Sequence, residues 1–259
     1  MATGFFTDTT VCIGCKACEV ACKEWNQLPD DGLFFTGMSY DNTVDLGAST
    51  WRHVSFIERP VALNTQETGL GDFSWLLMSD VCKHCKSAAC LEACPTGSIV
   101  RTEFDSVYVQ SDVCNGCGMC VSACPFGVID RREDDGRAWK CTLCYDRQKD
   151  GMTPACAQAC PTQSIQFGDL DELKARATER VAELHERGMS EAYLYGADQE
   201  GTDGLNAFFL LVDEPEVYNL PPEPVSPTKT LSDAWRSLGA SLLGMAAVTA
   251  AAVLAGRRR

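Results

Sequence analysis

CNGCGMCVSACP occupies residues 114–125. It sets three cysteines three residues apart and a fourth four residues later, directly before a proline. This is the C-x2-C-x2-C-x3-C-P spacing of bacterial [4Fe–4S] sites, in which the first three thiolates bind irons of one cubane. In proteins with two clusters, the fourth cysteine of the run binds the neighbouring cluster. The spacing therefore predicts that Cys124 binds a different cluster from Cys114, Cys117 and Cys120.

The same unit occurs four times, because each cysteine group begins C-x2-C and ends C-x3-C around a middle of variable length. The groups are Cys12, Cys15, Cys18 and Cys22; Cys82, Cys85, Cys90 and Cys94; Cys114, Cys117, Cys120 and Cys124; and Cys141, Cys144, Cys156 and Cys160. In the fourth group a longer loop separates the second cysteine from the third, but the group still has four cysteines. Sixteen cysteines at four per cubane predict four [4Fe–4S] clusters with no thiol left over.

Two other uses of so many cysteines fit the spacing less well. Disulfides between cysteines only three residues apart would be strained, and disulfide-rich proteins are usually small and secreted. Structural zinc favours two C-x2-C arms set well apart around a tetrahedral ion. Cys114, Cys117 and Cys120 instead follow one another at steps of three. Iron–sulfur clusters are therefore the preferred interpretation.

The composition limits the function classes. The chain has 259 residues, enough for one or two domains, and a net charge of −14 with a pI of about 4.6. A nucleic-acid binder would need a basic face, so this balance argues against one. No G-x-G-x-x-G motif or phosphate-binding loop is present in the sequence, so nucleotide binding has no support. A row of clusters transfers electrons and breaks no C–H bond, so we expect no catalytic residues.

Outside the cysteine groups the pattern predicts a mixed chain of strands and helices. The expected elements are strands at 51–63, 73–78, 107–109 and 206–212 and a helix at 168–188. Asp169 is placed to cap that helix, with Glu172 at the capping-box position and Gly188 at its end. Residues 213–230 are rich in proline and are expected to form an irregular, extended arm.

The order of these segments predicts four regions. They are a four-cluster ferredoxin-like domain at 1–168 with an insertion at 26–81, a helix–strand extension at 169–212, a proline-rich arm at 213–234, and a terminal helix with a basic tail at 235–259. The predicted fold class is α+β, with two ferredoxin-like double-cluster units that carry insertions and a single C-terminal transmembrane helix.

The terminal helix is expected from Leu238–Gly256, which has 19 residues and no charge. Such a helix would be about 28 Å long, close to the thickness of the hydrocarbon core of a bilayer. Trp235 before it and Arg257–Arg259 after it favour a membrane span over the alternative, a buried helix of a soluble domain. The positive-inside rule then places the basic tail in the cytoplasm and the cluster domain outside. The N-terminus shows no export signal, so transport in the folded state on a partner's signal is expected.

Several residues beside the cysteines have expected supporting roles. Gly14, Gly116 and Gly118 give the loops room to wrap a cubane. The prolines after Cys94, Cys124 and Cys160 fit the first turn of a helix that begins at the fourth cysteine. His84 lies inside the second group, as a hydrogen-bond donor beside the cluster or as a packing residue. Lys140, Asp146 and Arg147 flank the fourth group, as tuning charges or as plain salt bridges, and His53 and His185 are expected at the surface or in structural roles.

The sequence also resembles a known family. DTTVCIGCKACEVACKEWN, CPFGVI, KCTLCYDR, PACAQACPTQSIQFG and RVAELHERG are similar to the iron–sulfur (beta) subunit of membrane-bound respiratory formate dehydrogenases. The cysteine groups fit the whole class of four-cluster subunits of molybdenum and tungsten oxidoreductases. The WN after the first group, the stretch from RVAEL through YLYG to NLPPEP, and the single terminal helix resemble the formate branch more narrowly.

The resemblance implies how the groups share their cysteines, which spacing alone leaves open. Adjacency favours pairing the second group with the third, which leaves the first with the fourth. The implied ligand sets are Cys12, Cys15, Cys18 and Cys160 for cluster one; Cys82, Cys85, Cys90 and Cys124 for cluster two; Cys114, Cys117, Cys120 and Cys94 for cluster three; and Cys141, Cys144, Cys156 and Cys22 for cluster four.

The resemblance also implies the partners. A molybdopterin (Mo or W) catalytic alpha subunit would oxidise formate, and a membrane cytochrome b gamma subunit would reduce quinone in anaerobic respiration. This chain would be the non-catalytic electron-transfer subunit between them. Two alternatives stay open: the same role in another molybdoenzyme, of the polysulfide or dimethyl sulfoxide reductase type, and a free-standing ferredoxin-like carrier or scaffold.

Overall fold

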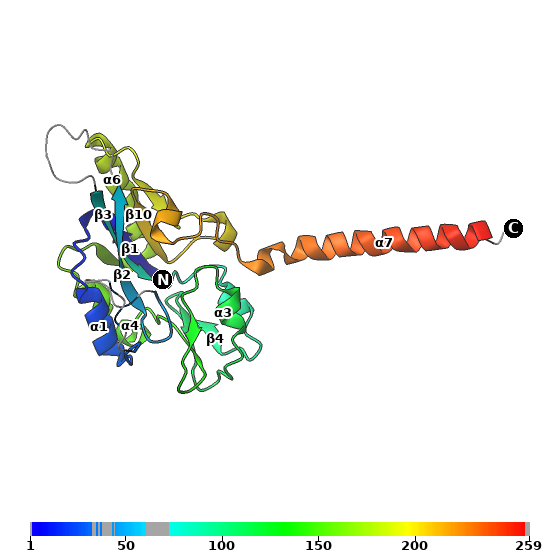
Figure 1. The fold of residues 1–259 in the computed structure, drawn as a ribbon, viewed down its shortest axis with the longest axis horizontal. Coiled ribbons are helices and arrows are strands. Elements are labelled where there is room, and N and C mark those ends of the chain that lie inside the picture. Colours follow the sequence, from blue (N-terminus) through cyan, green and yellow to red (C-terminus); the bar gives the residue numbers. More distant parts are fainter. Residues whose placement is uncertain are drawn as a thin grey trace.

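A body of short helices and strands carries one long helix that projects away from it (Figure 1). The computed structural model describes residues 2–32, 35, 37, 43, 45–60 and 73–256. The projecting helix is α7, Leu231–Gly256, which begins earlier than the expected residue 238. The basic tail Arg257–Arg259 and residues 61–63 of the expected strand lie outside the described residues.

A four-stranded mixed sheet organises the body. Its order is β8-β1-β10-β9, where β1 is parallel to β10 and the two outer pairs are antiparallel. The strands are β1, Thr3–Asp8; β8, Ile165–Asp169; β10, Ala207–Leu211; and β9, Tyr193–Tyr195. Both faces of this sheet are covered, because Phe5 packs with the cysteine-bearing loops and Phe6 packs against α6, Leu170–Glu186.

Three two-stranded sheets and five short helices complete the cysteine-bearing part. The strands are β2, Arg52–Pro60, with β3, Phe73–Val81; β4, Ile99–Arg101, with β5, Val107–Val109; and β6, Asp130–Arg131, with β7, Ala138–Trp139. The helices are α1, Ala17–Asn26; α2, Ala89–Glu92; α3, Met119–Ala123; α4, Tyr145–Lys149; and α5, Ala155–Gln158.

Most elements expected from the sequence are present. Helix α6 begins after Asp169, whose side chain accepts hydrogen bonds from the backbone N–H groups of Asp171 and Glu172. The arm from residue 213 is largely irregular, but it contains the 3-10 turns Pro215–Tyr218 and Pro227–Thr230, and a further 3-10 turn lies at Glu200–Thr202. The division of the chain at residue 168 stays a prediction.

The prolines that follow the fourth cysteines do not begin helices, so that expectation is wrong. Helices α2, α3 and α5 end just before the fourth cysteine of their groups, and the chain then turns back. The backbone N–H groups of Gly97, Gly127 and Gln163 donate to the carbonyls of Cys94, Cys124 and Cys160. The proline is therefore the second residue of a tight turn, where its fixed φ angle is favoured.

The terminal helix meets only part of its expectation. Residues 238–256 are helical, and the side chains of Leu242, Leu243 and Val248 are exposed along the projecting part. Among the residues that the structure describes, no helix has both the length and the apolar character needed to span a membrane.

Candidate metal centres

Each C-x2-C pair closes around one residue in the left-handed region. That residue directly precedes the second cysteine of its group, and its φ is +65° at Gly14, +45° at His84, +72° at Gly116 and +56° at Leu143. The left-handed region suits glycine and is uncommon for other residue types. The repeated turn brings the first two thiols of each group onto one side of the loop.

The C-x3-C pairs use helical geometry. Cys18 and Cys22 both lie on α1, and the third and fourth cysteines of the other groups are also four residues apart, across α2, α3 and α5. Four residues advance a helix by about 6 Å along its axis while keeping both side chains on one face. One helical turn therefore carries the fourth thiol away from its own group and toward another.

The structure brings together two expected ligand sets around cavities. One cavity is lined by Cys82, Cys85, Cys90 and Cys124. A second is lined by Cys12, Cys15, Cys18 and Cys160. In each case three thiols come from one group and the fourth comes from another.

The other two expected sets also lie together. The pKa of Cys22 is raised well above its usual value, by burial and then by the neighbouring thiols of Cys141, Cys156 and Cys144. Burial raises the pKa of Cys120 to about 11, with Cys114, Cys117 and Cys94 adding to the effect. Cys141 lies near Cys82 as well, so the set around Cys22 adjoins the set around Cys85.

The donor chemistry fits iron–sulfur clusters. All sixteen cysteines are among the described residues, and none of them forms a disulfide. Nowhere in the described parts of the sequence do three or more Cys, His, Asp or Glu side chains converge closely enough to hold a single metal ion. The cavities place four thiols around a larger space. The backbone N–H of Leu143 and the hydroxyl of Ser79 lie within 3.3 Å and 3.2 Å of the sulfur atoms of Cys141 and Cys18.

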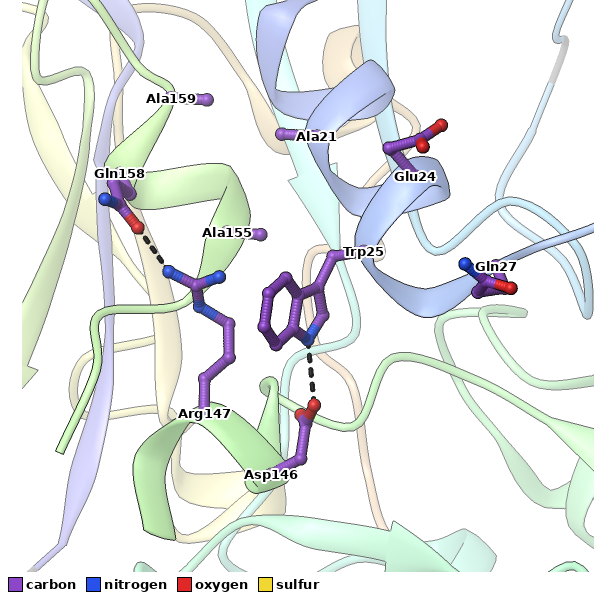
Figure 2. Close-up of a pocket in the computed structure, with 9 residues that line it drawn as sticks. All are labelled: Ala21, Glu24, Trp25, Gln27, Asp146, Arg147, Ala155, Gln158 and Ala159. Atoms are coloured by element: carbon purple, nitrogen blue, oxygen red, sulfur yellow. Dashed lines mark hydrogen bonds between the residues drawn. The ribbon is translucent and has the colours of Figure 1, made fainter. Parts of the chain in front are cut away.

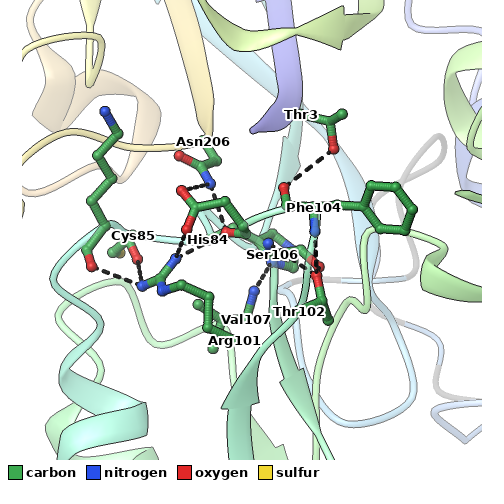
Figure 3. Close-up of polar contacts among 11 residues, drawn as sticks. Thr3, His84, Cys85, Arg101, Thr102, Phe104, Ser106, Val107 and Asn206 are labelled. Atoms are coloured by element: carbon green, nitrogen blue, oxygen red, sulfur yellow. Dashed lines mark hydrogen bonds and ion pairs between the residues drawn. The ribbon is translucent and has the colours of Figure 1, made fainter. Parts of the chain in front are cut away.

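His84 gives an independent test of that fit. It is fully buried, it lines the cavity of the Cys82 set, and its Nδ1 accepts a hydrogen bond of 3.0 Å from the backbone N–H of Val107 (Figure 3). The proton of the neutral ring is therefore on Nε2, for which the described residues offer no acceptor. A buried donor without a partner is costly, and sulfur atoms of a cluster in the adjoining cavity would accept from it.

The hairpin beside His84 is fastened to the main sheet. Arg101 donates to the carbonyl of Cys85, and Asn206 donates to the carbonyl of Asp105, next to β10 (Figure 3). The second cysteine group is thus held against the strand that pairs with β1. Of the other histidines, His185 lies at hydrogen-bond distance from the carbonyl of Ala192. His53 is buried, so the expected surface position, one of two alternatives for this residue, is wrong.

The WN dipeptide after the first group has a structural role. Asn26 donates to the carbonyl of Cys22 at 2.9 Å and lies 3.6 Å from its sulfur. Trp25 donates from Nε1 to Asp146 at 2.8 Å, and the Arg147 guanidinium lies over its ring at 4.2 Å (Figure 2). Asp146 and Arg147 therefore join α1 to α4 beside the fourth group.

Buried cations lie beside the thiols. Lys140 Nζ is 3.5 Å from Cys82 Sγ, which places this expected residue at the sulfur atoms. Arg52 and Lys83 were not expected from the sequence. Arg52 Nη2 lies 3.3 Å from Cys156 Sγ. Lys83 is paired with Asp80, and its charge opposes the burial that raises the pKa of Cys85 and Cys124. Of these two residues, only Lys83 could have been found from the sequence, because it lies inside the second cysteine group.

Comparison with known proteins gives the same cofactor. Residues 73–170 and residues 11–98 each match a 4Fe-4S dicluster domain. The protein is 42% identical over 252 residues to the formate dehydrogenase-O iron-sulfur subunit of Escherichia coli, which covers 95% of the present sequence and 80% of that relative. It belongs to the iron–sulfur subunits of formate dehydrogenases.

Two other relatives show how far the similarity extends. The formate dehydrogenase iron-sulfur subunit of Haemophilus influenzae is 41% identical, over 84% of the present sequence and 68% of that relative. The B subunit of the anaerobic dimethyl sulfoxide reductase of Escherichia coli is 34% identical, over 67% of the present sequence and 76% of that relative. The expected family, the electron-transfer role and the iron–sulfur cofactors, with sixteen cysteines for four [4Fe–4S] clusters, are confirmed.

Proposed function

We propose that this protein carries electrons from a molybdopterin subunit that oxidises formate to a membrane cytochrome b subunit that reduces quinone. The observation that carries this proposal is the match to formate dehydrogenase subunits along nearly the whole sequence. The match to the dimethyl sulfoxide reductase subunit covers less of the sequence at lower identity, which favours a formate-oxidising partner over that alternative.

The proposed ligand sets are those implied by the family resemblance. Two of them are supported by the four-thiol cavities, and the other two by the mutual proximity of Cys22 and Cys120 to their expected partners. When bound, the clusters supply one-electron transfer in which no covalent bond is formed or broken. The protein holds each cluster with four thiolates and excludes water from the buried thiols, such as Cys141 and Cys156.

A serine substitution tests the crossed ligand sets. Replacing Cys22 with Ser should damage the cluster held by Cys141, Cys144 and Cys156 and leave the cluster of Cys12 intact. Electron paramagnetic resonance of the reduced complex distinguishes the two, with Cys12→Ser as the matched control. Loss of the same signal in both variants would show that the first group keeps all four of its own cysteines.

The two partners would dock at opposite ends of the body. Cys15 and Cys117 are the exposed cysteines, and the helix that follows each carries an exposed apolar side chain, Val20 on α1 and Met119 on α3. Helix α3, which follows Cys117, lies on the side of the body from which α7 projects, whereas α1 lies across the body from it (Figure 1). We therefore assign the α3 end to the membrane partner and the α1 end to the catalytic partner.

Photo-crosslinking tests this orientation. A photoreactive residue at position 20 should capture the catalytic subunit, and one at position 119 should capture the membrane subunit. Both side chains are exposed, so the substitutions should leave the fold intact. The reverse pattern would overturn the assignment.

Helix α7 would be the anchor to the membrane partner. Its uncharged stretch, Leu238–Gly256, contains small residues, and nothing lies within 4 Å of a Cβ built on Gly239 or Gly244. Small residues allow helices in a membrane to approach closely, so we propose that α7 packs against helices of the cytochrome b subunit. A protein truncated after Thr230 should still co-purify with the catalytic subunit and lose the membrane subunit. Retention of the membrane subunit would contradict this role.

The basic tail gives the proposed sidedness. Arg257–Arg259 would lie in the cytoplasm and the cluster domain on the outer face, by the positive-inside rule. A reporter fused after Arg259 should be active in the cytoplasm, and an extracytoplasmic reporter would reverse the orientation.

The function itself is tested on the solubilised native complex under argon. Addition of formate should reduce the clusters rapidly, seen as new paramagnetic signals and as bleaching of the visible absorption. Clusters that dithionite reduces but formate does not would assign the protein to another molybdoenzyme.

A further inference from the structure

Arg52 occupies an unusual position for a charged side chain. It begins β2, is only 1% exposed, and is among the largest fully buried side chains of the protein. No carboxylate pairs with it within the described parts of the sequence, and its Nε has no hydrogen-bond partner there. A buried cation without a counter-charge is unfavourable, so the position calls for a negative group that the polypeptide alone does not supply.

The contacts of Arg52 point to sulfur on two sides. Its Nη2 lies 3.3 Å from Cys156 Sγ, and its Nη1 donates to the carbonyl of Ser79 at 3.1 Å. The Ser79 hydroxyl lies 3.4 Å from Nη1 and 3.2 Å from Cys18 Sγ. Cys18 belongs to the proposed set of cluster one and Cys156 to that of cluster four. Arg52 and Ser79 therefore form a continuous polar bridge between the two sets.

We propose that Arg52 is the shared counter-charge of clusters one and four, and that it raises the reduction potential of both. The inference rests on the proposed ligand sets. One-electron reduction adds one negative charge to a cluster and forms or breaks no bond, while the guanidinium stays protonated. A fixed positive charge in a buried site favours the more negative, reduced form, and net charge and hydrogen bonds to sulfur are the main determinants of such potentials.

The surroundings agree with this role. The Arg52 guanidinium also lies over the ring of Phe5 at 4.8 Å, which fixes its plane without adding a charge. Because the site is buried, added salt should screen it little.

Lys140 provides a matched comparison at another junction. Its Nζ lies 3.5 Å from Cys82 Sγ and donates to the carbonyls of Val107 at 2.6 Å and Cys141 at 3.0 Å. It is buried like Arg52, but it lies between the sets of clusters two and four. The two cations therefore predict different pairs of affected clusters.

The test is a redox titration of the intact complex followed by electron paramagnetic resonance. The four signals are first assigned with Cys15→Ser, Cys85→Ser, Cys117→Ser and Cys144→Ser variants. In Arg52→Gln the reduced-to-oxidised ratio of clusters one and four at a fixed potential should fall about tenfold, or ~59 mV for a one-electron couple, with clusters two and three unchanged. Arg52→Lys keeps the charge and should show less than half of that shift. Lys140→Met should shift clusters two and four instead.

Three results would overturn the proposal. They are unchanged potentials for clusters one and four in Arg52→Gln, equal shifts of all four clusters, and a shift in Arg52→Lys as large as in Arg52→Gln. If Arg52→Gln does not assemble, the potentials of Arg52→Lys decide the question. Shifts of clusters one and four that stay below half of ~59 mV and change little with added salt support the proposal, and larger shifts overturn it. Wrong ligand sets would be evident separately, because Cys160→Ser and Cys22→Ser would then remove signals other than those of clusters one and four, respectively.

Discussion

The surroundings of His84 determine the protonation state and the tautomer of its imidazole. The pKa of its imidazole is lowered well below its usual value, by burial and then by the positive charges of Lys140, Arg101 and Arg52. The ring is therefore neutral, and its Nδ1 already accepts from Val107. The tautomer follows from these two facts, and Nε2 becomes a donor at the cavity of the Cys82 set.

Replacement of His84 with Asn should lower the potential of cluster two. Asn tolerates the left-handed backbone at this position, where φ is +45°, and its carbonyl can still accept from Val107. His84→Asn loses the donor at Nε2, so the reduced cluster should lose about 1 kcal/mol of stabilisation. His84→Gln is the control, because its amide can replace that donor. Redox titration measures the shift, and coupling to an exchangeable deuteron at cluster two should disappear only in His84→Asn.

An equal shift in both variants would assign His84 to packing, which was the other expectation from the sequence. The cysteines themselves could be predicted residue by residue, because their spacing is a local property of the sequence. Arg52 and Ser79 could not. Arg52 is 104 positions from Cys156, and the pairing of β2 with β3 places it opposite Val81, next to Cys82 in the sequence. Nothing in the sequence around Arg52 indicates a cluster.

At the level of elements, the turns after the short helices repeat one conformation. Gly97, Gly127 and Gln163 close these turns with φ angles of +67°, +64° and +54°. Proline favours both the first turn of a helix and the second position of a tight turn, so the prolines alone do not distinguish the two settings. The short helices before the prolines are only four or five residues long in α2, α3 and α5, which leaves little periodicity to recognise.

A glycine substitution isolates the contribution of this conformation. Nothing lies within 4 Å of a Cβ built on Gly127, so Gly127→Ala changes the backbone preference without a clash. The left-handed conformation costs an alanine about 1–2 kcal/mol, so the unfolding midpoint should fall. Gly168→Ala is the matched control, because that site is equally open and its φ lies outside the left-handed range. It should be neutral or slightly stabilising. Equal effects would show that the turn imposes no conformational demand.

The main sheet could be predicted only in part. Strand β10 is a fully buried apolar run and was expected, whereas β1 was not. Phe5 and Phe6 are consecutive and both buried, because opposite faces of the sheet are covered, so the alternating pattern of a half-exposed strand is missing. The parallel register of Phe5 with Ala207 joins the two ends of the cysteine-bearing region. A contact of that separation has no local signal.

For the whole molecule, cluster binding should be linked to proton release. Burial raises the pKa of Cys144 to about 11, with Cys156 adding to it, and burial raises the pKa of Cys18 to about 11 against the opposing effect of Arg52. These thiols are protonated at neutral pH when no cluster is bound, and they bind iron as thiolates. Reconstitution in weak buffer should therefore acidify the solution, and its yield should rise with pH from neutrality toward about 11, where these thiols ionise. Yield that falls with pH would contradict the sign.

The cysteines are also distributed unevenly between the hydrophobic cores. The core around Phe5, Trp51 and Val54 includes Cys18, Cys22 and six other cysteines, and the core around Ile99 and Ile129 includes six. The core between α6 and the main sheet has none among the described residues. Clusters therefore cross-link two of these cores, and their free energy of binding is part of the free energy of folding there.

Removal of the clusters should accordingly unfold the molecule in parts. After oxidative removal with a chelator, amide protons of α1, α3 and α5 should lose protection from hydrogen exchange, because four thiols no longer hold their loops together. Helix α6 and strand β10 should keep theirs, because Leu173, Ala177 and Phe208 pack without cysteines. Hydrogen exchange with mass spectrometry resolves these segments in one experiment. Simultaneous loss of protection in α6 and α1 would mean that the sheet depends on the clusters too, and that the whole protein folds as a single cooperative unit.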